Sequence, residues 1–367
     1  MVYRSIRTVK ADAARRSFPE LGQGIVWAVL GTGVDASHPH FARYDNLGGD
    51  VAGLHRDFVD GTGEGPGKSL IDSGGVGTHV AGIVAGSLGA TYPARSVAVF
   101  EERQSADGLT EVTRSHVEPG DMSGLAPQCK IVSLRVLEDD LTGQPSSVIA
   151  ALQYVRVVNG DGRDIRIHGV LIPLGFAFDP RWFGCGASPL CQEVDRLVSI
   201  GVCVVVAAGN SGQAPVRNSV TNTGVMVTIN DPGNAEMAIT VGSTHRDMPH
   251  RYGVSYFSSK GPTADGRSKP DLVAPGESVT SAAAGRLRHN LPYKGTSKAV
   301  YVSNSGTSVA SAHVAGVAAG FLSVNREFIG RPTEVKRILL DSATSLGRRE
   351  EFQGRGLVDL MRALQSV

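Results

Sequence analysis

The stretch Ser305-Gly-Thr-Ser308-Val-Ala-Ser-Ala-His313-Val-Ala-Gly316 decides the fold of this 367-residue chain. Residues 307–322 are small and apolar almost all round, a pattern typical of a helix that is buried on every side in the centre of a large domain. Ser308 then lies in the first turn of that helix, where free backbone N–H groups and the helix dipole favour negative charge. The stretch therefore predicts a central helix with a hydroxyl at its amino-terminal end.

Around this helix, short β-branched runs alternate with helical patterns. Residues 147–158 and 189–200 carry apolar side chains at three- and four-residue spacing, as amphipathic crossover helices do. Such alternation predicts an α/β fold in three layers, with a mainly parallel central sheet and helices on both of its faces. The buried strands of this sheet are predicted at residues 25–30, 131–137, 167–174, 201–207, 225–229 and 237–241.

A single domain over residues 1–367 is the simplest organisation, because the sequence contains no internal repeat and no linker composition. Residues 1–24 form an N-terminal extension ahead of the first predicted strand. The glycine-dense residues 61–75 and the charged, irregular residues 101–122 are predicted to be surface insertions. After Pro332, apolar spacing predicts further helices that close the rim of the domain.

Composition excludes several classes of protein. Apolar residues make up 41% of the chain and aromatic residues 6%, with 46 glycines, which suits a globular enzyme rather than a disordered or coiled-coil chain. The formal net charge of +1 gives no long-range attraction to nucleic acid or to an anionic membrane, so neither partner is expected. No apolar run reaches the roughly 20 residues that cross a bilayer, and the first residues lack a secretory apolar core. A cytoplasmic location is the resulting expectation.

The 4 cysteines are too few for a disulfide scaffold in a chain of this length. Cys185 and Cys191 are close enough in sequence to close a small loop. Reduced thiols are the favoured interpretation, because no secretory signal is seen. The histidines and cysteines also lack the paired spacing of a transition-metal site.

Several segments together resemble motifs of the subtilisin-like serine peptidase (subtilase) family, over roughly residues 25–365. The stretch around Ser308 is similar to the nucleophile motif of that family, and Ala207-Ala-Gly-Asn210-Ser-Gly is similar to its oxyanion asparagine motif. The resemblance implies that Ser308 occupies the nucleophile position. It also implies that Asn210 and the backbone N–H of Ser308 form the two donors of an oxyanion hole.

Two further motifs depart from the family at the positions that carry chemistry. Gly75-Val76-Gly77-Thr78-His79-Val80-Ala81-Gly82 resembles the histidine motif, but Val76 stands where the general base should be. Val29-Leu30-Gly31-Thr32-Gly33-Val34-Asp35 resembles the aspartate motif, but Gly31 stands in place of the aspartate. Valine cannot accept a proton and glycine cannot orient an imidazole. The resemblance thus implies a peptidase scaffold that lacks two of its three triad side chains.

The leading functional prediction is a catalytically inactive pseudopeptidase that still binds extended peptide. A second interpretation is a serine endopeptidase that was inactivated by engineered substitution at Gly31 and Val76, its native activity being peptide-bond hydrolysis through an acyl-enzyme on Ser308. A third is a weak hydrolase in which Ser308 is assisted by water or by a group of the substrate. The sequence alone leaves these three open.

The resemblance also implies where a peptide or protein ligand lies. Extended peptide is expected between a segment containing Gly143 and Gln144 and a segment formed by Pro173, Leu174 and Gly175, pairing as an added strand. The prolines at 145 and 173 lack an N–H group, which lowers the number of backbone bonds.

No catalytic cofactor is required by the family chemistry. Structural calcium is common in the family, and the acidic turn at residues 57–60 is a candidate for it, although the sequence assigns no ligands. Solvated loop carboxylates are the favoured interpretation of this turn.

Other polar residues near these motifs are not expected to act. His79 corresponds to a packing position of the family motif, and Asp35 and His38 are expected to make solvated turn contacts. The run 31–36 imitates a dinucleotide-binding fingerprint, but the proline at 39 interrupts the helix that such a fingerprint must open. The run 67–69 lacks the leading glycine of a phosphate loop. Nucleotide binding is therefore not expected.

Overall fold

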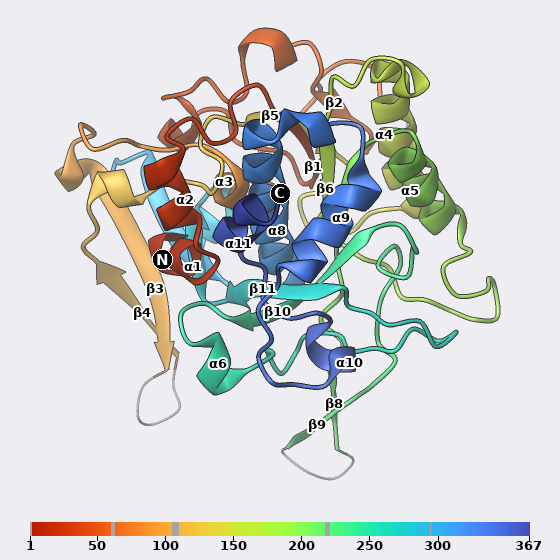
Figure 1. Cartoon of the computed structure of the whole chain (residues 1–367). Helices are drawn as coiled ribbons and strands as arrows, with labels where there is room; N and C mark the ends of the chain where they lie inside the picture. Colours follow the sequence, from red (N-terminus) through yellow and green to blue (C-terminus); the bar gives the residue numbers. More distant parts are fainter. Residues whose placement is uncertain (1, 60–62, 105–109, 217–220, 294) are drawn as a thin grey trace.

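A seven-stranded sheet forms the middle layer of the protein (Figure 1), which we describe from a computed structural model that covers residues 2–59, 63–104, 110–216, 221–293 and 295–367. The strand order is β11-β10-β7-β6-β1-β5-β2, and every neighbouring pair is parallel. This arrangement confirms the predicted α/β class. The strands are β1 (Val26–Gly31), β2 (Arg56–Asp57), β5 (Lys130–Arg135), β6 (Gly169–Ile172), β7 (Cys203–Ala207), β10 (Ile239–His245) and β11 (Leu272–Glu277).

Side chains that alternate along β1 show how the two faces of the sheet are covered. Trp27 and Val29 pack in the core that includes α8 (Thr307–Val324) and α3 (Val76–Val84). Ala28 and Leu30 point the other way and pack with α4 (Pro145–Val158) and α5 (Pro189–Ser199). A strand buried on both faces needs apolar residues at every position, which explains its continuous hydrophobic run. Four other helices pack around α8: α1 (Val2–Thr8), α2 (Ala11–Ser17), α9 (Pro332–Asp341) and α11 (Leu360–Gln365).

The central helix α8 is buried almost completely, as its composition predicts. In the part of the chain that the structure describes, it is also the one helix whose length and hydropathy would suit a membrane span. Because 83% of that span is buried inside the protein, we assign it to the core. Short helices complete the rim: α6 (Pro249–Tyr252), α7 (Gly285–His289), α10 (Glu350–Gln353), η1 (Pro39–Phe41), η2 (Gly49–Val51), η3 (Ala94–Ser96), η4 (Pro119–Asp121), η5 (Gly160–Gly162) and η6 (Arg326–Phe328).

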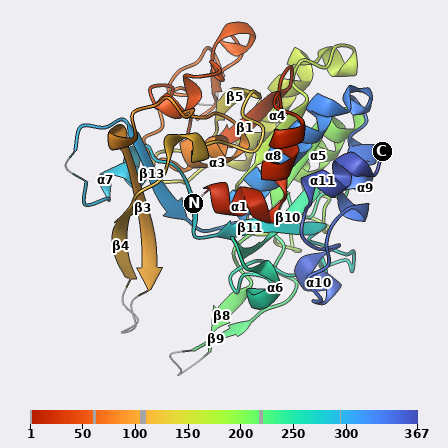
Figure 2. The same cartoon turned by 60° about the vertical axis from the view of Figure 1, so that its left-hand side comes forward.

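A second sheet of four strands lies beside the first, and its β3–β4 hairpin projects from the body of the protein (Figure 2). Much of the segment at 101–122, which the sequence predicts to be an irregular surface insertion, therefore has regular structure, although residues 105–109 lie outside the described part. Charged residues usually indicate an exposed segment, but Glu101 is buried. The guanidinium of Arg246 lies 3.2 Å from its carboxylate and neutralises it. The remaining strands are β12 (Val279–Ala282), β13 (Ala299–Asn304), β3 (Val97–Gln104), β4 (Thr110–Ser115), and the pair β8 (Gln213–Pro215) and β9 (Asn222–Gly224).

One predicted strand does not exist. Residues 225–229 are irregular, and Val227 adopts a positive φ of 58° with 51% of its surface exposed. The backbone N–H of Val225 donates to the carbonyl of Gly212, whereas that of Thr228 donates to the carbonyl of Lys260. The segment therefore pairs with two different loops and not with one partner strand. Apolar composition alone did not reveal this division of its hydrogen bonds.

Candidate active site

The predicted site residues lie where parallel strands of the central sheet end. Val29 of β1 is in register with Leu171 of β6, and Leu171 is in register with Val205 of β7. The strands finish level with one another, so Gly31 at the end of β1 meets the segments that follow β6 and β7 at one edge. In open parallel sheets, this carboxyl edge is where ligands bind.

Hydrogen bonds join Asn210, after β7, to the first turn of α8. Oδ1 of Asn210 accepts from the backbone N–H of Thr307 at 2.9 Å and from its hydroxyl at 3.0 Å. The hydroxyl oxygen of Thr307 accepts in turn from the N–H of Gly209 at 3.1 Å. Asn210 is exposed, and Ser308, the second residue of α8, is half-buried. The loop after β7 and the start of α8 therefore form one hydrogen-bonded unit.

Three polar groups surround one small space beside Gly306. A Cβ atom at this glycine would lie 3.0 Å from Oγ of Ser308, 3.6 Å from Nδ2 of Asn210 and 3.8 Å from the backbone nitrogen of Ser308. In the described ranges, that backbone N–H bonds to no acceptor. The arrangement places two N–H donors beside a serine hydroxyl, as needed to stabilise a developing oxyanion.

The hydroxyl of Ser308 has no basic partner. Its Oγ makes no hydrogen bond to any residue that the structure describes, whereas its carbonyl accepts from Ser311 at 2.9 Å. His79 is fully buried, and its Nε2 contacts the carbonyl of Val302 at 3.1 Å, as a packing residue does. His313 is also fully buried and contacts Ser5 through Nε2 at 2.8 Å. Both imidazoles are thus committed to contacts elsewhere.

Gly31 and the first turn of α3 are direct neighbours. A Cβ atom on Gly31 would lie 3.5 Å from Cα of Gly77, which is ordinary contact, and φ at Gly31 is not in the left-handed region. Val76 is the first residue of α3 and packs, half-buried, against the core around α8. The two positions that the family motifs give to the aspartate and the histidine are therefore adjacent, and neither residue can ionise.

A buried carboxylate that the sequence interpretation missed holds this corner together. Asp72 is 3% exposed and accepts from the hydroxyl of Thr32 at 2.6 Å and from the N–H groups of Gly75 and Thr78, each at 2.7 Å. It thereby caps α3 and ties it to the end of β1. Burial raises the pKa of Asp72, although these donors oppose the shift. The signal was an aspartate shortly before the motif at residues 75–82.

Asp72 also corrects the prediction of a surface insertion at 61–75. Residues 60–62 lie outside the described part, and residues 64–68 are mostly exposed. The chain then turns inward, because the carboxylate of Asp72 must reach the N–H groups at the start of α3. The second half of this segment is therefore part of the site's support.

The two segments predicted to hold peptide border the same edge. Gly143 and Gln144 immediately precede α4, and residues 173–175 immediately follow β6. Within the described ranges, the backbone N–H groups of Gly143 and Gly175 bond to no acceptor. Both segments therefore present free donors to an added strand.

Gly175 connects this edge to the loop that carries Asn210. A Cβ atom on Gly175 would lie 3.1 Å from Cβ of Asn230, whose N–H bonds to the carbonyl of Ala208 at 3.1 Å. The peptide segment and the oxyanion donors thus lie on neighbouring loops.

An apolar pocket of about 280 Å³ adjoins both peptide segments. Pro145 borders it from the start of α4, and Phe176 borders it directly after Gly175. Trp182 and Phe183 stand over it and are 75% and 44% exposed. Such a pocket suits an apolar side chain.

In the acidic turn at residues 57–60, Asp57 has an ion-pair partner. Asp57 lies 3.2 Å from the guanidinium of Arg135 and accepts from the N–H groups of Val59 and Lys68 at 3.1 and 2.9 Å. Asp60 lies outside the described part. Among the residues that the structure describes, no group of three or more His, Cys, Asp or Glu could hold a metal ion.

The turn after β1 differs from its prediction at one residue. Asp35 does make a turn contact, accepting from the N–H of Ser37 at 2.9 Å. His38 is 2% exposed and bonds through Nε2 to the carbonyl of Val300 at 2.9 Å, so the prediction that it is solvated is wrong. The neighbouring sheet covers it, which no local pattern shows. Cys185 and Cys191 are both free thiols in the structure.

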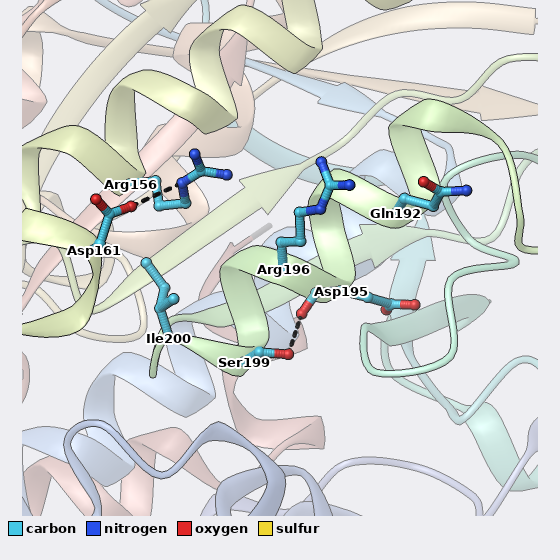
Figure 3. A pocket seen from close by; sticks show the side chains of 7 residues that line it. All are labelled: Arg156, Asp161, Gln192, Asp195, Arg196, Ser199 and Ile200. Atoms are coloured by element: carbon cyan, nitrogen blue, oxygen red, sulfur yellow. Dashed lines mark hydrogen bonds and ion pairs between the residues drawn. The ribbon is translucent and has the colours of Figure 1, made fainter.

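A broader depression between α4 and α5 is not a rival site (Figure 3). Arg156 pairs with Asp161 at 3.0 Å and with the buried carboxylate of Glu193 at 3.0 Å. Arg196 pairs with the same glutamate at 3.2 Å. These charges satisfy one another, and the hydroxyl of Ser199, which also lines the depression, donates to the backbone carbonyl of Asp195 at 2.8 Å.

Comparison with known proteins agrees with the α/β fold described above. The model of the subtilase family of peptidases matches residues 22–356. Serine protease AprX of Bacillus subtilis (strain 168) is 30% identical over 322 residues, which cover 87% of this chain and 61% of AprX. Subtilisin DY of Bacillus licheniformis is 27% identical over 360 residues, 98% of this chain and 97% of that protein.

Pyrolysin of Pyrococcus furiosus is 31% identical over 330 residues, but the match covers only 21% of its length. The chain thus spans less than two thirds of some relatives and nearly all of others. The family match covers most of this chain, including the segments at the carboxyl edge of the sheet described above, so the chain belongs to the subtilase family.

Proposed function

We propose that this subtilase is a pseudopeptidase, which binds an extended peptide segment at the carboxyl edge of its sheet without cleaving it. The observation that carries the proposal is the environment of Ser308: two N–H donors lie beside its hydroxyl, and no residue in the described ranges offers a base there. Membership of a peptidase family implies a peptide or protein as the ligand.

The absence of a base beside Ser308 among the described residues argues against ordinary proteolysis. A serine hydroxyl is a weak nucleophile near neutral pH and needs a neighbouring group that takes its proton. Val76 offers none, and Gly31 offers no carboxylate to orient an imidazole. Loss of the base alone costs about a million-fold in turnover, a magnitude that was measured on subtilisin, a member of this family.

Peptide binding does not depend on the missing side chains. The free N–H groups of Gly143 and Gly175 can pair with an added strand, and the N–H groups near Ser308 can donate to a peptide carbonyl. The pocket beneath Trp182 then receives an apolar side chain of the same peptide. Backbone pairing with one apolar anchor favours extended, unstructured segments as ligands.

Binding can be followed through tryptophan fluorescence. The chain has 2 tryptophans, of which Trp27 is fully buried and Trp182 is 75% exposed. Peptides with an apolar residue should change the emission of Trp182, and the change should vanish in Trp182→Phe. A Gly175→Pro variant, which removes one free donor, should bind more weakly, whereas absence of any peptide binding to the wild type would refute the groove.

Inertness is tested with a serine-directed fluorophosphonate. We expect no stoichiometric labelling of the wild-type protein over hours, with Ser308→Ala as the matched blank. Rapid labelling of Ser308 would contradict the proposal and would favour the weak Ser308-dependent hydrolase instead.

A further inference from the structure

A second concave site lies between the two N-terminal helices and the loops beside them. It has a volume of about 380 Å³ and receives side chains from α1, α2, the segment after η1 and the segment around η4. Both helices are drawn in red in Figures 1 and 2. The charged residues that line this arginine pocket are Arg7, Arg15, Arg16, Arg43, Asp12 and Asp121.

Positive charge exceeds negative charge in the arginine pocket. Four guanidinium groups face two carboxylates, so the formal balance is 4 − 2 = +2. Asp12 is engaged with Arg16 at 3.2 Å on the same helix. A chain with a total formal charge of +1 thus concentrates cationic groups at one concave surface.

Arg15 is half-buried in this pocket and has no direct partner. It makes no hydrogen bond or ion pair with any residue in the described ranges, and Asp12 and Asp121 attract it only from a distance. Burial lowers the pKa of Arg15, because the guanidinium loses water without gaining a close carboxylate. Covering a charge in this way is costly unless a ligand supplies the missing acceptors.

Arg43 offers a second free guanidinium to the same space. Its Cζ lies 5.1 Å from the ring centroid of Tyr44, and its Nη1 rests against Gly89, where any side chain would collide with it. Neither Arg43 nor the hydroxyl of Tyr44 has a hydrogen-bond partner among the described residues. Ser87, 5% exposed, also lines the pocket, and its oxygen accepts from the N–H of Gly89 at 3.2 Å.

We propose that the arginine pocket binds a phosphate-type oxyanion. Two guanidinium forks without partners match the several acceptor oxygens of such a group, and charge-assisted bonds of this kind are the strong ones. The hydroxyls of Tyr44 and Ser87 add neutral donors at the rim. The arginine pocket shares no residue with the peptide groove. A test of phosphate binding is therefore independent of a test of the proposed function.

Inorganic phosphate is the probe for the test. Titration calorimetry and thermal unfolding are run in sodium phosphate and in sodium chloride of equal ionic strength. We expect phosphate, but not chloride, to raise the midpoint of unfolding, and Arg43→Gln to weaken phosphate binding at least about tenfold. Arg43 is exposed, so this variant should fold normally. Arg15→Lys, which keeps the charge and removes the fork, should also weaken binding.

Arg337→Gln is the matched control, because it removes the same charge from an exposed pair on α9. Equal loss of binding in Arg337→Gln and Arg43→Gln would overturn the site, as would equal stabilisation by chloride and phosphate. A second arm uses vesicles of phosphatidylcholine with and without phosphatidate. Arg43-dependent binding to phosphatidate would support the site and assign a lipid source, whereas phosphate binding without vesicle binding would support a soluble source.

Discussion

Thr307 holds the side-chain amide of Asn210 from two directions, through its backbone N–H at 2.9 Å and its hydroxyl at 3.0 Å. Because both donors occupy Oδ1, the NH₂ group is the end left free beside Ser308. The orientation of this amide is therefore fixed by the residue directly before the serine, before any ligand arrives.

Restoring the two missing side chains should restore chemistry. In a Gly31→Asp, Val76→His double variant we expect peptide cleavage at least about a thousand-fold above the wild type, since the family motifs imply that a base and its orienter then lie beside Ser308. Gly31 has room for a side chain and no left-handed φ, so the substitution should not strain the strand end. Cleavage is measured on a chromogenic peptide, with Ser308→Ala in the same background as control.

Failure of this double variant to cleave, despite a normal circular dichroism spectrum, would mean that the three positions do not converge as the family motifs imply. Success would also show that substitution at Gly31 and Val76 is sufficient to account for inactivity.

The side-chain amide of Asn210 should affect the rate of peptide cleavage in a variant that cleaves peptide. In the restored double variant, Asn210→Ala is expected to lower kcat by about a hundred-fold or more, while KM changes little, because the donor acts on charge that develops in the transition state. Thr307→Val should have a smaller effect, since the backbone donor to Oδ1 remains. An equal rise of KM without loss of kcat would assign Asn210 to ground-state binding instead.

Stability should fall in mild acid. Burial lowers the pKa of His38, His79 and His313 to about 4 and that of His40 to about 3, below the 6.5 of an exposed imidazole. Between those values the unfolded state binds more protons, so the free energy of unfolding decreases as pH falls through 6.5. At pH 5 each histidine costs on the order of 2 kcal/mol.

Urea unfolding between pH 7.5 and 5 measures this slope. His313→Gln should make it shallower, whereas His116→Gln, at an exposed position, should leave it unchanged. A slope that is equal in all three proteins would contradict the assignment of acid sensitivity to buried imidazoles.

Asp72 should be the most sensitive support of the α3 corner. Asp72→Ala leaves three buried donors without an acceptor and should cost about 3 kcal/mol or more of unfolding free energy. Asp341→Asn, in an exposed pair on α9, should change it by less than about 0.5 kcal/mol. Chemical denaturation at pH 7.5 compares the two, and a similar small effect in both would mean that Asp72 is dispensable.

Much of the fold was predictable because its signals are local. The run of β1 is apolar at every position, and α5 is amphipathic from Pro189 to Ser199. The pattern of each element alone therefore predicts which of its faces are buried. The segment 225–229 was not predictable, because its backbone bonds to two loops that are distant in sequence. The partners of His38 and Glu101 were hidden for the same reason.

The candidate site was predictable only as far as its motifs reach. Asn210 and Ser308 were placed by resemblance, and the structure brings them to one edge. Asp72 was missed, since its role depends on a helix end and a strand end meeting in space. The arginine pocket was missed because its arginines are scattered between residues 7 and 43, its other members extend beyond residue 120, and they share no motif.

Gly31 ends a strand and Val76 begins a helix, so the backbone of these two elements fixes both positions. A reaction centre built from the tips of elements can therefore be dismantled without disturbing the framework that carries it. In this architecture, catalysis can be lost without loss of folding. The folded protein then keeps a surface that can acquire other functions.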